Sequence, residues 1–361
     1  MFFRRSVLTF LAGATAGAGA QAPVRHDVRI CAGGDVSLGT NLDTSWVERS
    51  PLTPGRPVAL PDSWPLLAPL VPLMADADVV LVNVEGAIGE GDAPKKCARN
   101  STMCYAIRQP PTAAAALRRL NAAARVVGNV ANNHAHDAGE PGFRETLRRL
   151  GHAGVLVTGA DTIATPVEGA PGDTIGVLGF SPWSLAGVGD TAAVRRHVAR
   201  AVDRYGRVIV TMHIGAEGAA ARHTYDHVER FAGENRGNSP AFARAAVDGG
   251  ASLVVGHGPH VLRGVEWIGR ALIAHSLGNL VTYGPFNVAE YNGHGAILCA
   301  TLAADGGVRG AAIRSTRQRE AGHVERDESN AAAQDIADLT RLDFPLTGAR
   351  VNRTGDITRR P

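Results

Sequence analysis

The chain has 361 residues, of which 45% are hydrophobic and 5% aromatic, with a formal net charge of +3. This length suffices for one large α/β domain or two small ones. The basic residues form no concentrated stripe, which excludes the class of nucleic-acid binders. After the N-terminal segment, no run reaches the ~18 apolar residues that a membrane helix needs.

Residues 1–22 have the composition of an export signal. Arg4 and Arg5 precede an apolar stretch from Val7 to Ala18, and small residues follow it at Ala20-Gln21-Ala22. The arginine pair resembles a twin-arginine signal; an uncleaved anchor is the alternative. Removing the segment takes two of the 37 basic residues and no acid, which leaves a net charge of about +1. We expect an exported protein, periplasmic or on the cell surface.

Strand-like and helical patterns alternate after the signal, which predicts an α/β fold. The strand-like runs are Val28–Ala32, Val79–Val82, Arg125–Val130, Val155–Thr158, Thr174–Gly179, Val208–Met212 and Leu253–Val255. The helical patterns are Pro65–Met74, Thr112–Ala123, Gly142–Ala153, Ala192–Tyr205 and Pro240–Gly249.

Two β-hairpins are predicted to close this region. The first joins Gly264–Ile268 to Ala271–His275, and the second joins Ala296–Ala303 to Val308–Arg314. The remaining residues, 317–361, are predicted to be a polar tail with one short helix at Ala331–Leu342.

The four cysteines fall into two kinds of sequence. Cys31 and Cys299 sit in apolar strand-like runs, and we expect both to be buried thiols. Cys97 and Cys104 lie in a polar loop, where an oxidising compartment would permit a disulfide. The sequence leaves that pairing open.

Clusters of polar residues follow five of the strand-like runs. They are Asp35; Asn83 and Glu85; Asn132, Asn133 and His134; His213 and Glu217; and His257 and His260. In α/β sheets, ligand sites gather outside the carboxyl ends of the strands. Oxygen and imidazole ligands together suit zinc, manganese or iron, and the lack of cysteine fits an ion open to substrate. One or two divalent metal ions are therefore predicted here.

Each of these residues also has a structural reading. Asp35 alone would be a turn carboxylate, the asparagines could serve a turn, and His213 and His257 could be satisfied core histidines. Their joint placement at strand ends favours a site. His275, at the end of a predicted strand, is left undecided, as is His294. Other histidines, namely His26, His136, His152, His197, His223, His227 and His323, are expected at the surface.

Six ordered motifs resemble the bacterial capsule-biosynthesis family of CapA/PgsA-like proteins. They are GGDVSLG, ADVVLVNVEGAI, ANNHAHDAG, HIGAE, GHGPHVLRGVE and SLGNLV, and the similarity runs from about Val28 to Val281. That family is related to calcineurin-like metallophosphoesterases. The resemblance implies an α/β four-layer sandwich, in which two packed mixed β-sheets are flanked by helices, over residues 27–316.

The resemblance also implies roles for single residues. The implied metal ligands are Asp35, Glu85, Asn133, His213, His257 and His260, and His134 is the implied catalytic residue. The implied substrate-binding residues are Asn132, Glu217, Ser276 and Asn279, and Asp137 also belongs to the capsule-type pattern. Ser37 departs from the phosphoesterase pattern, which usually has a histidine ligand there, so one metal position loses a ligand.

Two functions follow as hypotheses. The first is a metal-dependent hydrolase of phosphoester bonds or of amide bonds in a polymer, with His134 as a proton donor. The second is a non-catalytic accessory factor that binds an anionic capsule polymer, such as poly-γ-glutamate, during assembly or export. Membrane-bound capsule synthesis machinery is a possible partner in either case.

Overall fold

The computed structural model describes residues 25–39, 62–90, 105–184, 187–283, 286–320 and 322–360. The predicted export signal and the pair Cys97 and Cys104 lie outside the described residues. Within these ranges, every helix is too short or too polar to cross a membrane.

The helices and strands alternate along the first two thirds of the chain, as predicted. The helices are α2 (Trp64–Leu67), α3 (Val71–Met74), α4 (Thr112–Arg118), α5 (Gly139–His152), α6 (Thr191–Tyr205), α7 (Ser239–Asp248) and α8 (Ala331–Asp343), with 3-10 turns η1 (Ala68–Leu70), η2 (Ala219–Ala221) and η3 (Glu290–Gly293). The strands are β1 (Val28–Ser37), β2 (Val79–Val84), β3 (Ala87–Ile88), β4 (Arg108–Gln109), β5 (Arg125–Asn129), β6 (Leu156–Thr158), β7 (Thr165–Ala170), β8 (Asp173–Phe180), β9 (Val208–His213), β10 (Glu229–Phe231), β11 (Glu234–Gly237), β12 (Leu253–His257), β13 (Val265–Ile268), β14 (Ala271–Ala274), β15 (Asn279–Thr282), β16 (His294–Leu302), β17 (Val308–Glu320), β18 (His323–Arg326), β19 (Arg350–Val351) and β20 (Asp356–Thr358).

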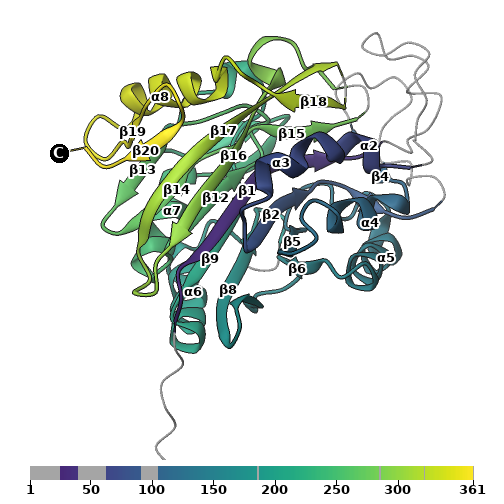
Figure 1. Ribbon diagram of the computed structural model, residues 1–361, viewed down its shortest axis with the longest axis horizontal. Helices are drawn as coiled ribbons and strands as arrows, with labels where there is room; N and C mark the ends of the chain where they lie inside the picture. Colours follow the sequence, from purple (N-terminus) through teal and green to yellow (C-terminus); the bar gives the residue numbers. More distant parts are fainter. Residues whose placement is uncertain are drawn as a thin grey trace, which may run out of the picture.

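Two mixed sheets form the centre of the molecule (Figure 1). The larger has the order β19-β20-β17-β16-β1-β2-β5-β6, with β15 paired to β1 and β18 to β17. The smaller has the order β13-β14-β12-β9-β8-β7. Strands β1, β2, β5 and β6 run parallel, and so do β8, β9, β12 and β14. Each sheet therefore brings several carboxyl ends to one edge.

Alternating side chains of β1 show how the layers stack. Val28, Ile30 and Ala32 belong to a core shared with β8, β9, β12 and β14, whereas Cys31 points to the opposite face and packs with α2, α3, α4 and α5. A third core joins the outer face of the smaller sheet to α6 and α7. The order helices, sheet, sheet, helices confirms the predicted four-layer α/β sandwich.

Most predicted elements are confirmed, with shifted ends. The helix expected at Pro65–Met74 is instead divided into α2, η1 and α3, because Pro69 and Pro72 lack the N–H groups that a continuous helix needs. Both hairpins are present, as β13–β14 and β16–β17. Gly269 lies in the first turn with a φ of +55°, a backbone angle that favours glycine.

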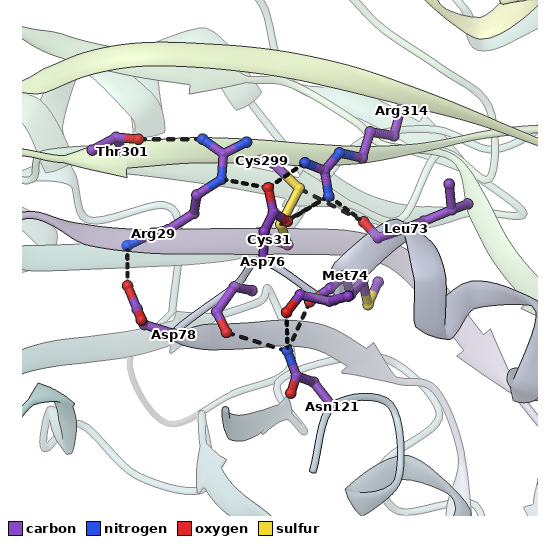
Figure 2. The surroundings of a disulfide bond; sticks show 12 residues. Arg29, Cys31, Leu73, Met74, Asp76, Asp78, Asn121, Cys299, Thr301 and Arg314 are labelled. Atoms are coloured by element: carbon purple, nitrogen blue, oxygen red, sulfur yellow. Dashed lines mark hydrogen bonds and ion pairs between the residues drawn. A yellow bond between two sulfur atoms is a disulfide. The ribbon is translucent and has the colours of Figure 1, made fainter. Parts of the chain in front are cut away.

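The prediction that Cys31 and Cys299 are free thiols is wrong. They form a disulfide between β1 and β16, although 268 positions separate them (Figure 2). The antiparallel register places the two residues directly opposite each other. Both side chains are fully buried, as expected. The pairing of distant strands, which composition does not reveal, decides their chemistry.

Beyond residue 316 the chain continues in β17 and adds β18, α8, β19 and β20. The predicted helix is confirmed as α8, which packs beside β17 and β19 (Figure 1). Ala332, Ala333 and Ile336 of α8 join the core between the sheets. The boundaries assigned to the domain and the tail stay a prediction.

Candidate metal centre

The carboxyl ends of strands from both sheets meet at one place. In the larger sheet Asp35 of β1 lies opposite Asn83 of β2 and Asn279 of β15. In the smaller sheet His213, the last residue of β9, lies opposite His257, the last of β12. Ligand atoms of these residues approach within hydrogen-bond or ion-pair distance across the gap between the sheets.

Asp35 is at the centre of this group and is fully buried. Its Oδ1 accepts a hydrogen bond from Asn83 Nδ2 at 2.8 Å and lies 3.8 Å from Nδ1 of both His213 and His257. Its Oδ2 lies 3.1 Å from His260 Nδ1. One carboxylate therefore lies close to side chains from three segments that are far apart in the sequence.

Glu85 completes a close group with Asp35 and His260. Each of the three offers a ligand atom, and these atoms all lie within 4.8 Å of one another. Glu85 Oε1 is 3.4 Å from His260 Nε2 and 3.8 Å from His213 Nε2. His260 adopts a left-handed backbone with a φ of +57°, unusual for a residue with a side chain. Strain of this kind is common where a ligand has to be aimed.

Two glycines let the ligand-bearing strands approach the loop before β15. A Cβ on Gly34 would lie 2.0 Å from the carbonyl oxygen of Gly278, and one on Gly256 would lie 2.1 Å from that of His275. Each glycine directly precedes a ligand, Asp35 or His257. A larger residue at either position would push this loop away from the strand that carries the glycine.

Burial and neighbouring charges shift the pKa values of Asp35, His260 and Glu85 in opposite directions. Burial would raise the Asp35 pKa, but the hydrogen bond and charge of His260 hold it well below its ordinary value. Burial would lower the His260 pKa, but the carboxylates of Glu85 and Asp35 hold it well above. For Glu85 burial prevails and raises the pKa far above its ordinary value. A cation bound between Asp35 and Glu85 would favour the ionised form of both side chains.

The two strand-end histidines behave in the opposite way. Burial lowers the pKa of His213 well below its ordinary value, and lowers that of His257 to about 4. Both imidazoles are therefore neutral at neutral pH, the form that binds a metal ion.

The donor atoms fit a divalent cation. Glu85 Oε1, His213 Nε2, both ring nitrogens of His257 and Asn133 Oδ1 are buried and have no hydrogen-bond partner among the residues that the structure describes. A buried lone pair without a partner costs free energy, and proteins rarely leave several together. Two carboxylates, imidazoles and an amide oxygen are a ligand set for zinc, manganese or iron. The candidate ligand groups are thus present; the identity of the ion stays a prediction.

A row of asparagines supports the ligands from behind. Asn83 Oδ1 accepts hydrogen bonds from Asn129 Nδ2 at 2.8 Å and Asn132 Nδ2 at 3.2 Å, while its own Nδ2 holds Asp35. The sequence predicts no role for Asn129, although this residue is the last of β5. Asn132, predicted to bind substrate, is buried and makes these supporting contacts instead; a substrate contact by Asn132 stays a prediction.

His134, the predicted catalytic residue, is held by a carboxylate. Its Nδ1 lies 2.5 Å from Asp137 Oδ2, which also accepts a hydrogen bond from the backbone N–H of Ile107 at 2.7 Å. The backbone N–H of His134 donates to Asn132 Oδ1 at 3.1 Å. Because Asp137 accepts the hydrogen on Nδ1, the nitrogen left to exchange a proton is Nε2.

The other predicted substrate-binding residues differ in their surroundings. Glu217 pairs with Arg236 at 2.6 Å and lies 4.0 Å from His260 Nε2. Asn279 Oδ1 accepts a hydrogen bond from His260 Nδ1 at 3.0 Å. Ser276 is fully buried and its hydroxyl accepts a hydrogen bond from the N–H of Gly278. Their predicted contacts with substrate stay predictions.

The undecided histidines belong to other networks. His275 is fully buried between Ser239, whose hydroxyl is 2.7 Å from Nδ1, and Glu266, whose carboxylate is 3.0 Å from Nε2. His294 pairs with Asp335. The seven histidines expected at the surface are exposed or half-buried.

Fold and site together define a layered α/β protein with a buried centre suited to a divalent metal ion. A family model described as Bacterial capsule synthesis protein PGA_cap matches residues 29–283. The chain therefore belongs to this bacterial capsule synthesis family, as its motifs predicted.

Two relatives of the chain carry the name CapA. It is 29% identical over 173 residues to the capsule biosynthesis protein CapA of Bacillus anthracis, covering 42% of this chain and 39% of that one. It is 30% identical over 164 residues to the PGA biosynthesis protein CapA of Bacillus subtilis, covering 42% and 41%. The match thus spans about two fifths of each relative.

Among solved structures, the chain is similar to a 5'-nucleotidase precursor from Thermus thermophilus. The sequence identity is 13% and the TM-score 0.42, with 89% of this chain and 59% of that one covered.

Proposed function

We propose that this protein is an exported, metal-dependent hydrolase that acts on a phosphoester bond. The observation that carries the proposal is the set of buried donor atoms on Glu85, His213 and His257, which lie around the Asp35 carboxylate and have no hydrogen-bond partner in the described part of the chain. The buried Oδ1 of Asn133 also has no such partner there, and we propose that it joins this set. A divalent ion held there would supply Lewis-acid chemistry, polarising an ester oxygen and acidifying a water molecule.

The chain's own residues would orient the substrate and move a proton. Asn83 and Asn279 fix Asp35 and His260 in place, so that the ligands do not have to rearrange during the reaction. His134, held through Nδ1 by Asp137, presents Nε2 as the proton donor to the leaving oxygen. The low pKa of His257 keeps one of its ring nitrogens unprotonated at neutral pH, so that the lone pair of this nitrogen is available to an ion.

The disulfide supports export. Disulfides persist in oxidising compartments and are rare in the bacterial cytoplasm. The Cys31–Cys299 pair joins two central strands of the larger sheet. This agrees with the export signal predicted at residues 1–22.

A second candidate function is favoured by Ser37. It is fully buried at the end of β1, and its hydroxyl has no hydrogen-bond partner in the described part of the chain. Ser37 stands where the resemblance expects a histidine ligand, so one metal position is weakened. A protein with a weakened metal pair could bind an anionic capsule polymer through the ion without cleaving it. The net charge of about +1 after signal removal gives little long-range attraction for such a polyanion.

The proposal is tested on protein purified without chelator. The metal content is measured first, and the same sample is assayed on an aryl phosphomonoester, an aryl phosphodiester and poly-γ-glutamate. We expect hydrolysis of a phosphoester that stops when a chelator removes the metal and returns when the metal is restored. Metal-loaded protein that binds poly-γ-glutamate and hydrolyses none of the three would contradict the proposal and support the accessory function.

A further inference from the structure

A cleft lies beyond the end of β8, next to β11 and the first turns of α6 and α7. It has a volume of about 580 Å³, within the usual range of small-molecule sites. Trp183, which follows β8, lines this cleft, and its ring lies edge-on to His213 with 6.3 Å between the ring centroids. We call it the Trp183 cleft. The indole of Trp183 therefore borders both this cleft and His213 of the candidate centre.

The walls of the Trp183 cleft are apolar, with a few hydrogen-bonding groups. Trp183 is 36% exposed and Val228 is 51% exposed, so both offer apolar surface to a ligand. Thr191, Glu234 and Asn235 add a hydroxyl, a carboxylate and an amide. Among the described residues that line the cleft, Glu234 is the only charged one. The cleft thus lacks the basic side chains that a carboxylate-rich ligand needs.

Arg236, close to the cleft, is not available as an anion-binding group. It is buried, its charge is matched by Glu217 at 2.6 Å and Glu234 at 3.3 Å, and its guanidinium carbon stacks 4.8 Å from the centroid of the Trp183 ring. Its backbone carbonyl accepts a hydrogen bond from the N–H of Gly215. Arg236 therefore holds the indole in place and links this wall to the centre through Glu217.

We propose that the Trp183 cleft binds an uncharged ring, a sugar or a nucleobase, on the molecule whose ester bond lies at the Asp35 centre. This inference rests on the proposed function. The flat face of such a ring stacks on the indole, and its edge hydroxyl or amino groups donate to Glu234 and Asn235. A γ-linked glutamate chain would instead bring carboxylates against Glu234, and like charges in contact disfavour binding. The cleft thus selects against the polyanion and for a neutral ring.

The test uses the full-length, metal-loaded protein and measures binding by calorimetry. The probes are methyl β-glucoside, adenosine, a γ-linked glutamate trimer and inorganic phosphate. We expect one of the two neutral rings to bind, which identifies the source of the ring, and the glutamate trimer not to compete with it. Trp183→Ala should weaken ring binding by roughly tenfold or more, whereas phosphate binding at the metal centre should not change.

Matched variants separate stacking from damage to the fold. Trp183→Phe keeps an aromatic face and should retain most of the affinity, and Trp267→Phe, in β13 away from the cleft, should behave as the wild type. Glu234→Gln should weaken ring binding and admit the glutamate trimer. The inference is overturned if neither ring binds, if Trp183→Ala leaves ring affinity unchanged, or if the trimer binds the wild type in a Trp183-dependent way. Since binding needs no turnover, a chain that binds the ring but cleaves no ester contradicts only the proposed function.

Discussion

Strand β1 carries two clusters of potential metal ligands, four residues apart and on opposite faces. In one cluster Cys31 and Cys299 lie close to Asp76, and in the other Asp35 lies close to Glu85 and His260. In the first cluster the potential ligand atoms already have partners. The sulfur atoms are bonded to each other, and Asp76 accepts hydrogen bonds from Arg314 and Arg29 (Figure 2). The second leaves buried donor atoms unpartnered among the residues that the structure describes.

The carboxylates of the two clusters show the difference directly. Hydrogen bonds from Arg314 lower the pKa of Asp76 to about 2, so this group is a stable anion with its own cations. Burial raises the pKa of Glu85 far above its ordinary value, since no arginine neutralises it to the same degree in the described part of the chain. Residue types alone therefore do not define a metal site. Buried lone pairs without a partner, gathered beside two acidic side chains, indicate a candidate site, because a cation would satisfy them.

Among the variants that would test the difference between the two clusters, Asp35→Asn is expected to have the largest effect, a loss of metal affinity. The change removes the carboxylate that touches His213, His257 and His260. Metal affinity should fall by more than ~100-fold, because removing a group that only hydrogen-bonds to a metal ligand already lowers metal affinity by about 10–100-fold. Metal analysis and phosphoester hydrolysis measure the result. Asp76→Asn, the matched change in the other cluster, should bind as much metal as the wild type. Equal metal loss in both variants would contradict the assignment of the ion to the Asp35 cluster.

The next effect is expected from His134→Ala. If His134 donates the proton, the rate of hydrolysis should fall by ~10²–10⁴-fold while the metal content stays near that of the wild type. His136→Ala, two residues away, changes an exposed histidine and should leave the rate unaltered. Wild-type activity in His134→Ala would remove this residue from the mechanism. Loss of metal would instead make His134 a part of the binding site.

A smaller effect, on stability alone, is expected at the disulfide. Replacing both Cys31 and Cys299 by alanine should lower the free energy of unfolding by about 2–4 kcal/mol, because the bond no longer restricts the unfolded chain. Denaturant unfolding measures this change. The metal content of the folded variant should equal that of the wild type. A variant of normal stability that has lost its metal would show that the first cluster also serves the ion.

The smallest effect is a dependence of stability on pH in chelator-treated protein. The pKa of His257 is about 4 in the folded chain, against an ordinary 6.5 in the unfolded chain. Between these values the unfolded chain binds more protons at this residue, so the contribution of His257 to stability falls as the pH decreases from 6.5 towards 4, by no more than about 3 kcal/mol. The raised pKa of Glu85 contributes in the opposite sense, which is why the variant is compared with the wild type. His257→Gln should flatten this part of the profile in denaturant titrations. An identical slope in both proteins would contradict the low pKa.

The sequence by itself determined the alternation of strands and helices and pointed to most residues of the candidate centre, while the four-layer arrangement followed from the resemblance of its motifs. Runs of valine and isoleucine ended in Asp35, His213 and His257, and the ends of parallel strands meet at one edge of a sheet. Glu85 and His260 followed from the same pattern. The type of each side chain and its distance from a strand end are local properties, which a single sequence displays.

Only the tertiary structure decided the remaining features. The disulfide depends on the register of β1 against β16, and the role of Asn129 depends on its place opposite Asn83. The need for Gly34 and Gly256 appears only when the loop before β15 lies against both strands. The edge-on contact between the rings of Trp183 and His213 cannot be predicted from their spacing in the sequence. Each is a contact between segments far apart in the chain, and the packing of the sheets, not local propensity, sets such contacts.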